Sequence, residues 1–301
     1  MINQHQRSYK EQIENDQSPL GKRPEWLKVR LPGGENYNDV RSLMRDQRLN
    51  TVCEEAKCPN IGECWNSRTA TFMILGDTCT RSCGFCNVKL GLPAFVDIDE
   101  PRRVADSVQK LKLKHVVITS VNRDELPNGG AEIFAETVRL IRELTIDCTV
   151  EILIPDFKGE ENAYNLILSH KPDILNHNLE TIPRLYHAVR PQAKYSRSLE
   201  LISWFKDKGL KTKSGIMVGI GEEDSEVLEL ISDLKKAGCD ILTIGQYLQP
   251  TKNHLPVSRY VTLEAFNAYK EYALGVGFQA VESAPLVRSS YHAAEQARQV
   301  F

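Results

Sequence analysis

The sequence predicts an α/β fold, a partial (β/α)6 TIM-like barrel with an N-terminal cysteine-bearing extension and a C-terminal tail. From about residue 68, short runs rich in β-branched residues alternate with amphipathic stretches, which indicates βαβ units around a parallel sheet. About 210 residues carry six strand–helix pairs, whereas a complete TIM barrel typically needs about 250 residues. The chemically distinctive residues follow strands, where parallel barrels place their active sites. We therefore expect an open barrel of six units.

The expected strands are short apolar runs separated by turn residues. They are Thr71–Leu75, His115–Val121, Thr149–Ile154, Ile174–Asn178, Ser214–Ile220, Ile241–Leu248 and Phe278–Val281. The stretches between them carry apolar residues three and four positions apart, as one buried helix face requires. A doubly wound sheet is the alternative. It is disfavoured because Gly129 and Gly130 are followed by Ala131, without the third glycine of a dinucleotide-binding turn.

The composition is that of an ordinary globular protein. The chain has 301 residues, 41% apolar and 26% charged, and its 38 basic and 40 acidic residues leave a formal net charge of -2. This balance lacks the concentrated positive charge of nucleic-acid-binding proteins. The N-terminus lacks the apolar core of a signal peptide, and no stretch approaches the roughly 18 apolar residues of a membrane span. We expect a cytoplasmic protein with neither nucleic acid nor membrane as a partner.

Four segments are expected along the chain. Residues 1–24 are polar, with Pro and Gly breaks, and are predicted to form a mobile N-terminal arm. Residues 25–67 form a small, loop-rich extension that needs a metal cluster and the neighbouring domain to stay folded. Residues 68–283 form the partial barrel. Residues 284–301 form a C-terminal tail that carries the serine pair Ser289 and Ser290.

Three cysteines stand close together directly after the first predicted strand. Cys79, Cys83 and Cys86, the downstream set, have the spacing CxxxCxxC, and Phe85 precedes the last of them. Three thiols at the end of one strand can reach one small metal cluster, and cysteine runs of this kind ligate iron–sulfur clusters. Three protein ligands on a four-iron cluster leave one iron open to a non-protein ligand.

A second group of three lies just before the barrel. Cys53, Cys58 and Cys64, the upstream set, are spaced CxxxxCxxxxxC. Disulfides are disfavoured because odd groups of three pair poorly and a reducing compartment is expected. Structural zinc prefers four ligands in a closed site, and neither set offers four locally. Two iron–sulfur clusters are our interpretation, and a two-site zinc adaptor is the non-enzymatic alternative. Cys148 and Cys239 have apolar surroundings and are expected in the core.

The downstream loop resembles that of the radical SAM enzymes, and further motifs narrow the resemblance. Residues 52–65, which contain the upstream set, are similar to the auxiliary-cluster motif of the lipoyl synthases. Other similar segments follow later strands and approach the end of the chain. They are 176–181, 183–186, 189–191, 213–222, 245–250 and 288–293. Only about the first 24 residues and the last few lie outside this resemblance.

The resemblance implies a sulfurtransferase of lipoate biosynthesis that inserts sulfur into unactivated C–H bonds. The substrate would be an octanoyl chain amide-linked to a lysine of a lipoyl carrier domain, with one sulfur placed at each of carbons 6 and 8. The cofactors would be two 4Fe-4S clusters and S-adenosylmethionine (SAM), and a low-potential electron donor would be a partner. The cofactors perform the radical step, so the protein orients the reactants and excludes water.

The same resemblance distributes roles among the site residues. The downstream set would hold the cluster that binds and cleaves SAM, and the upstream set would hold the auxiliary cluster that supplies sulfur. Ser290 would be the fourth ligand of the auxiliary cluster, with Ser289 as its competitor. Phe85, Asn178 and Glu180 would contact SAM, although Asn178 and Glu180 could equally make structural hydrogen bonds.

Two positions depart from the pattern expected of that family. Asn122 stands where we expect Asp, and Ala284 stands where we expect Gly. Neither is expected to touch a cysteine ligand, so the departures leave the reaction class unchanged, and a shifted carrier preference is one possible consequence. The alternative enzyme is another radical SAM sulfur-inserting enzyme with an auxiliary cluster. Biotin synthase itself is disfavoured, because it would not show the upstream spacing.

Overall fold

The computed structural model describes residues 3–16, 23–29 and 32–301. The helices are α1 (Gln4–Asp16), α2 (Glu35–Asp46), α3 (Val52–Glu55), α4 (Ile61–Asn66), α5 (Glu100–Leu111), α6 (Ala131–Leu144), α7 (Glu161–Ser169), α8 (Tyr186–Val189), α9 (Tyr195–Asp207), α10 (Asp224–Lys236), α11 (Leu263–Gly275) and α12 (Ala293–Val300), with 3-10 turns η1 (Glu25–Leu27), η2 (Phe157–Gly159) and η3 (Pro183–Leu185). The strands are β1 (Asn50–Thr51), β2 (Thr71–Ile74), β3 (Thr78–Cys79), β4 (Lys89–Leu90), β5 (His115–Ser120), β6 (Thr149–Leu153), β7 (Ile174–Asn176), β8 (Lys211–Val218), β9 (Ile241–Gln246) and β10 (Ala280–Ser283). No helix in the described ranges is both long and apolar enough to cross a membrane.

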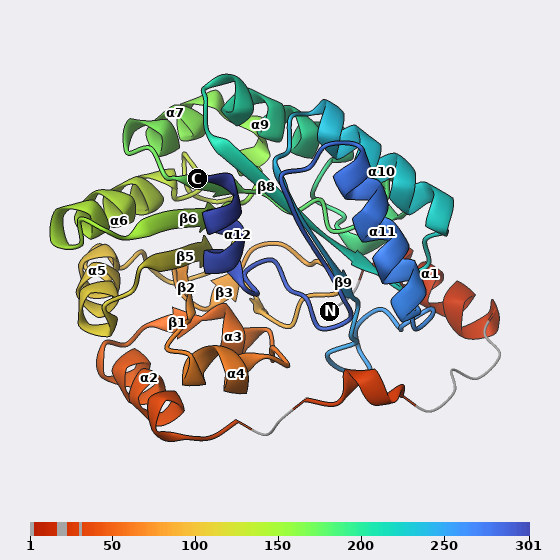
Figure 1. The fold of residues 1–301 in the computed structure, drawn as a ribbon, viewed down its shortest axis with the longest axis horizontal. Helices are drawn as coiled ribbons and strands as arrows, with labels where there is room; N and C mark the ends of the chain where they lie inside the picture. Colours follow the sequence, from red (N-terminus) through yellow and green to blue (C-terminus); the bar gives the residue numbers. More distant parts are fainter. Residues whose placement is uncertain (1–2, 17–22, 30–31) are drawn as a thin grey trace.

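One eight-stranded sheet forms an open barrel, in the order β1-β2-β5-β6-β7-β8-β9-β10. β1 pairs with β2 in antiparallel fashion, and every later neighbour in the order pairs in parallel. Helices α5, α6, α7, α9, α10 and α11 cover the outer face of the curved sheet (Figure 1). The predicted (β/α)6 partial barrel is confirmed. β10 adds a seventh parallel strand, and β1 adds a short antiparallel one.

The local sequence explains why these elements form where they do. The strands are buried on both faces, so β5 and β9 are rich in Val, Ile and Leu rather than alternating, and every residue of β9 is buried. The helices bury only one stripe, which in α6 includes Phe134, Val138 and Ile141. α5 begins with Pro101 in its first turn, and a capping box formed by Glu223 and Glu226 starts α10.

The C-terminal helix closes one end of the barrel. Ala297 and Val300 of α12 form a small apolar cluster with Ile174, Ile241 and Ala280. These three partners begin β7, β9 and β10, so α12 covers the end of the barrel where the strands start. Figure 1 shows α12 lying across the inner face of the sheet, inside the arc of helices. The tail is therefore anchored on both sides of the serine pair.

The N-terminal segment differs from the mobile arm that we predicted for residues 1–24. Its described part contains α1, which packs on the barrel. Gln6 is fully buried and donates a hydrogen bond to the carbonyl of Ser82 over 2.8 Å, and the Tyr9 hydroxyl donates to the carbonyl of Ile220 over 2.8 Å. The prediction missed this docking because polar side chains make these contacts, without an apolar stripe in the sequence. Residues 1–2 and 17–22 of the expected arm lie outside the described ranges.

Candidate active site

One cavity brings together the residues that the sequence predicted for the cluster and SAM sites. It has a volume of about 1760 Å³ and lies within the open barrel and beneath the N-terminal extension. Its lining includes both cysteine sets, Phe85, Asn178, Glu180, Ser289 and Ser290. Segments from the extension, the barrel and the tail therefore face one cavity, although Cys53 and Ser290 are 237 positions apart in the sequence.

The downstream set lies on a loop that the barrel holds at several points. Cys79 ends β3, which pairs in parallel with β4. The Gly84 N–H donates to the carbonyl of Val189 over 2.9 Å, and the Leu255 N–H donates to the Gly84 carbonyl over 3.0 Å. A Cβ on Gly84 would lie 2.8 Å from the Leu255 side chain, so only glycine fits this path without displacement. A ring nitrogen of His254 lies 2.9 Å from the Cys86 carbonyl oxygen.

Arg81 fastens this loop to the body of the barrel. Its guanidinium is buried, and its nitrogens lie 2.7 Å from Asp124 and 2.6 Å from Asp156. The ion pair holds the pKa of the Asp156 carboxyl far below its usual range, against the opposing effect of burial. The structure pairs it with two carboxylates, so Arg81 positions the loop.

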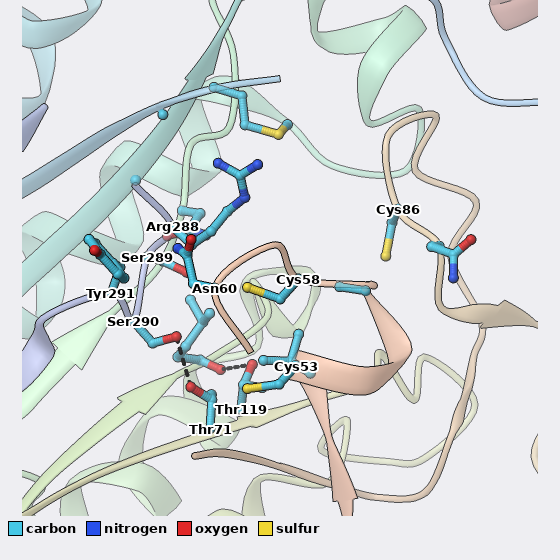
Figure 2. Close-up of a pocket in the computed structure, with 18 of the residues that line it drawn as sticks. Cys53, Cys58, Asn60, Thr71, Cys86, Thr119, Arg288, Ser289, Ser290 and Tyr291 are labelled. Atoms are coloured by element: carbon cyan, nitrogen blue, oxygen red, sulfur yellow. Dashed lines mark hydrogen bonds between the residues drawn. The ribbon is translucent and has the colours of Figure 1, made fainter. Parts of the chain in front are cut away.

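The upstream set is built on two short helices. Cys53 lies in α3, Cys64 lies in α4, and Cys58 occupies the turn between them, where its N–H donates to the Cys53 carbonyl over 2.9 Å. Thr51 caps the N-terminus of α3, where its side chain accepts the N–H of Glu54. Figure 2 shows Cys53 and Cys58 on one side of the cavity and Cys86 across from them.

The C-terminal tail contacts residues that lie close to the upstream set in the sequence. The Asn60 side chain donates to the carbonyl of Leu286 over 2.7 Å, and the Thr71 hydroxyl donates to the Ser290 hydroxyl over 2.7 Å. In Figure 2 the Ser290 side chain points toward Thr71, beside Cys53. The structure thus brings Ser290 next to the cysteines with which the resemblance groups it.

Burial raises the pKa of most thiols in the two sets. All eight cysteines are free thiols. Burial and neighbouring thiols raise the pKa of Cys64 and Cys86 to about 12, and burial raises that of Cys53 and Cys83 to about 11. Deprotonating the thiols of Cys53, Cys64, Cys83 and Cys86 is therefore favoured by a positive centre, which couples cluster binding to proton release.

The arrangement of the thiols suits iron–sulfur clusters. Among the residues that the structure describes, no group of three or more His, Cys, Asp or Glu side chains is arranged to hold one metal ion. The ligands of a single zinc ion converge at about 2.3 Å from it. The thiols of a four-iron cluster each bind a different iron atom and stand farther apart. Each set offers three cysteine ligands to the same cavity, which is a ligand set that an iron–sulfur cluster can use with one iron left open.

A polar wall faces the downstream set. The Asn178 side chain donates to Glu180 over 3.0 Å, and Arg190 donates to the Asn178 carbonyl over 2.7 Å. Burial raises the pKa of the Glu180 carboxyl, and the charge of Arg190 opposes this shift. Gly215 leaves room here, because a Cβ on it would lie 2.8 Å from Asn178 Oδ1. That buried oxygen has no hydrogen-bond partner in the protein, which leaves it available to a ligand.

Sequence reasoning missed two arginines of this wall. Arg190 and Arg288 both line the cavity, and the charges of Cys58 and Glu180 act on Arg288 while burial lowers its pKa. Both arginines belong to segments already singled out, 189–191 and 288–293. In the sequence, Arg288 directly precedes the serine pair and Arg190 follows Asn178 closely, and this was the signal available for them. Only the fold places the two segments around one cavity.

Asn122 corrects one expectation. We expected the departures Asn122 and Ala284 to touch no cysteine ligand. The structure instead places the backbone N–H of Asn122 3.3 Å from Cys79 Sγ and its side-chain amide nitrogen 3.8 Å from the same sulfur. β5 ends at Ser120, beside β2, and this adjacency in the sheet brings residue 122 to the cysteine loop. Ala284 is not among the residues that line the cavity.

Comparison with known sequences shows the family of this chain. Residues 73–245 match the radical SAM superfamily, and residues 2–58 match the N-terminal domain of lipoyl synthases of that superfamily. The family match thus includes most of the first 24 residues, which we had placed outside the resemblance. The chain is 60% identical over 276 residues to a lipoyl synthase of Rubrobacter xylanophilus, covering 91% of this chain and 86% of the relative. It is 53% identical to that of Koribacter versatilis, covering 95% of each.

Solved structures support the same fold at low sequence identity. Streptococcus suis SuiB bound to S-adenosylmethionine superposes with a TM-score of 0.57 at 12% identity, over 75% of this chain and 54% of that one. Methylornithine synthase superposes with a TM-score of 0.51 at 14% identity, over 93% of this chain and 87% of that one. With the fold, the paired cysteine sets and the extensive identity in agreement, we conclude that the chain belongs to the lipoyl synthase family of the radical SAM superfamily.

Proposed function

We propose that this protein inserts two sulfur atoms into an octanoyl chain carried on a lysine of a lipoyl carrier domain, at carbons 6 and 8. The family acts with SAM and two 4Fe-4S clusters on lipoyl carrier proteins. The observation that carries the proposal is that two separate sets of three thiols face one cavity, which also contains a serine beside the upstream set.

Each set has one task in this proposal. Cys79, Cys83 and Cys86 would hold the cluster that engages SAM, and the upstream set with Ser290 would hold the auxiliary cluster. When bound, these groups supply a carbon radical strong enough to break an unactivated C–H bond, together with the sulfur that is inserted. An electron donor of low potential belongs to the proposal as well.

The remaining lining residues bind and orient the reactants. Asn178, Glu180 and Arg190 offer an amide oxygen, a carboxylate and a guanidinium to the polar groups of SAM, with Phe85 beside them. Met73, Val117 and Leu153 line the same cavity and suit an alkyl chain. A buried, shaped cavity also excludes water, which protects a reactive radical from side reactions.

We also propose a cytoplasmic location. Iron–sulfur ligation by cysteine and eight free thiols require a reducing compartment.

Replacing cysteines with Ala should affect SAM cleavage and sulfur transfer differently in the two sets. Any replacement within the downstream set should abolish both SAM cleavage and product formation. A replacement within the upstream set should preserve 5′-deoxyadenosine formation and remove sulfur transfer, because it removes only the proposed sulfur source.

The measurement is an anaerobic single-turnover assay with reconstituted protein, SAM, reductant and an octanoyl-lysine peptide. Mass spectrometry should detect two sulfur atoms in place of two hydrogens with the unmodified protein. Thiolated product from an upstream variant would show that the auxiliary cluster is not the donor.

A further inference from the structure

Exposed apolar side chains concentrate in one short segment next to the cavity. Leu90, Leu92, Phe95 and Ile98 are 44%, 76%, 74% and 79% exposed. They are four of the ten large apolar side chains that are exposed in the described part of the chain, yet they occupy only residues 90–98. Single exposed apolar residues are ordinary on a protein surface, whereas a local concentration of them marks an interaction site.

The backbone of this apolar segment is held firmly while its side chains face solvent. The Gly91 N–H donates to the Cys79 carbonyl over 3.0 Å, and Arg123 donates to the Phe95 carbonyl over 3.3 Å. Arg103 pairs with Asp97 over 2.7 Å, just before α5 begins. The main chain of the segment is held at two points and the Asp97 side chain at a third, so the segment cannot turn its apolar side chains inward without breaking these contacts. A partner can therefore cover them at little ordering cost.

The apolar segment is continuous with the rim of the cavity. Leu90 belongs to β4, pairs with Cys79 of β3, and lines the cavity together with Val88. Leu92, Phe95 and Ile98 extend outward from that rim. This surface begins beside Cys79, a proposed cluster ligand, and continues away from the cavity. It therefore lies where the part of a bulky substrate that stays outside the cavity would rest.

The nature of the substrate identifies the occupant, and here the inference rests on the proposed function. The octanoyl chain is attached to a lysine of a folded carrier domain, so the chain must enter the cavity while the domain stays outside. One fatty chain and one lysine form a short tether, which presses the surface of the domain against the rim. We propose that residues 90–98 dock the carrier domain through an apolar patch next to its modified lysine, with Leu92 and Phe95 as the central contacts.

The test compares two substrates that differ only in the carrier. The double variant Leu92→Ser/Phe95→Ser changes two exposed side chains that do not line the cavity. In the single-turnover assay, the apparent second-order rate constant for thiolation of the octanoylated carrier domain should fall about tenfold or more, as for interface residues at a hot spot. Turnover of a short octanoyl-lysine peptide and SAM cleavage should stay at the level of the unmodified protein, since neither needs the docking surface.

A matched control is available at the other end of the barrel. Ile146 is 89% exposed and lies between α6 and β6, at the end where the strands start, whereas residues 90–98 follow the end of β2. Ile146→Ser should leave the rates with both substrates unchanged. It separates a specific docking effect from a general effect of removing surface apolar area.

Each other outcome has a distinct meaning. Equal loss with the carrier and with the peptide, or no loss with either, would overturn the docking proposal. A change of oligomeric state in the double variant, measured by analytical ultracentrifugation, would reassign the segment to contacts between copies of this chain. If the unmodified protein thiolated neither substrate, the proposed function itself would be contradicted. That result comes from the unmodified protein alone, so it is distinguishable from a failure of the docking proposal.

Discussion

The hydroxyl of Ser290 accepts a hydrogen bond from Thr71, in the cavity that the upstream set also lines. An oxygen held in this way has a defined position relative to Cys53, and its own proton remains free to leave. Serine oxygen is a harder and weaker partner for iron than a thiolate. A ligand of this kind can hold the fourth iron of a cluster and still release it when sulfur must be given up.

Two substitutions test this role. Ser290→Ala and Ser290→Cys should both assemble two clusters and cleave SAM but fail to insert sulfur, because Ala offers no ligand and Cys holds the iron too firmly. Iron and sulfide analysis, 5′-deoxyadenosine release and product mass measure the three steps. Ser289→Ala is the control and should insert sulfur normally. Normal product yield from both Ser290 variants would move the ligand to Ser289.

Asn122 tests how a single neighbour affects the downstream cluster. Its amide nitrogen approaches Cys79 Sγ at 3.8 Å, and hydrogen bonds to ligand sulfur raise the potential of an iron–sulfur cluster. Asn122→Asp replaces a donor by a carboxylate, so the cluster should become harder to reduce. One hydrogen bond of about 1 kcal/mol corresponds to about 40 mV for one electron. An EPR-monitored titration measures the shift, with Ala284→Gly as a control that should not move the potential.

The junction between β2 and α5 depends on a buried carboxyl group. Glu100 opens α5 and accepts the Leu75 N–H over 2.6 Å, at the end of the strand that leads into the cysteine loop. Leu75 and Gly76 both have positive φ, a conformation that is unfavourable for the non-glycine residue Leu75. Burial raises the pKa of Glu100 from 4.5 to about 7.

The sign of this shift predicts a pH dependence. The folded protein binds the proton of Glu100 more tightly than the unfolded chain does. Its contribution to the free energy of unfolding is therefore complete below about pH 4.5 and is lost as the pH rises to about 7, by on the order of 3 kcal/mol. Glu100→Gln keeps an acceptor without the charge, so its stability should fall less over this range. Denaturant unfolding of both proteins at pH 5 and pH 8 measures the difference, and parallel losses would contradict it.

Three parts of the chain complete one cavity in the whole molecule. The extension contributes the upstream set, the barrel contributes the downstream set, and the tail contributes Arg288 and Ser290. The α1 helix adds contacts to the loops at Ser82 and Ile220. Both cluster sites therefore depend on the assembled fold.

Fully loaded protein should contain about eight irons per chain, from two four-iron clusters. Iron and protein quantification on anaerobically reconstituted protein measures the ratio. Protein with about four irons and full sulfur-insertion activity would contradict the two-cluster model.

Local patterns in the sequence were sufficient for the barrel and for the six cysteines as candidates. Strand and helix periodicities arise from which faces are buried, and they are visible over five to fifteen residues. Cysteine spacing is equally local, because the ligands of one cluster can lie on one loop. The resemblance of residues 52–65 and 288–293 to lipoyl synthases then associated Ser290 with the upstream set.

Long-range contacts decided the rest. The docking of α1 depends on Gln6 and Tyr9 reaching carbonyls far along the chain, and polar contacts of this kind leave no periodic pattern in the sequence. The approach of Asn122 to Cys79 follows from the adjacency of β2 and β5, and the exposure of Leu92 and Phe95 follows from the path of the chain between β4 and α5. A residue's type and spacing determine which chemistry it can perform, whereas its neighbours and its solvent exposure exist only once the chain has closed around the cavity.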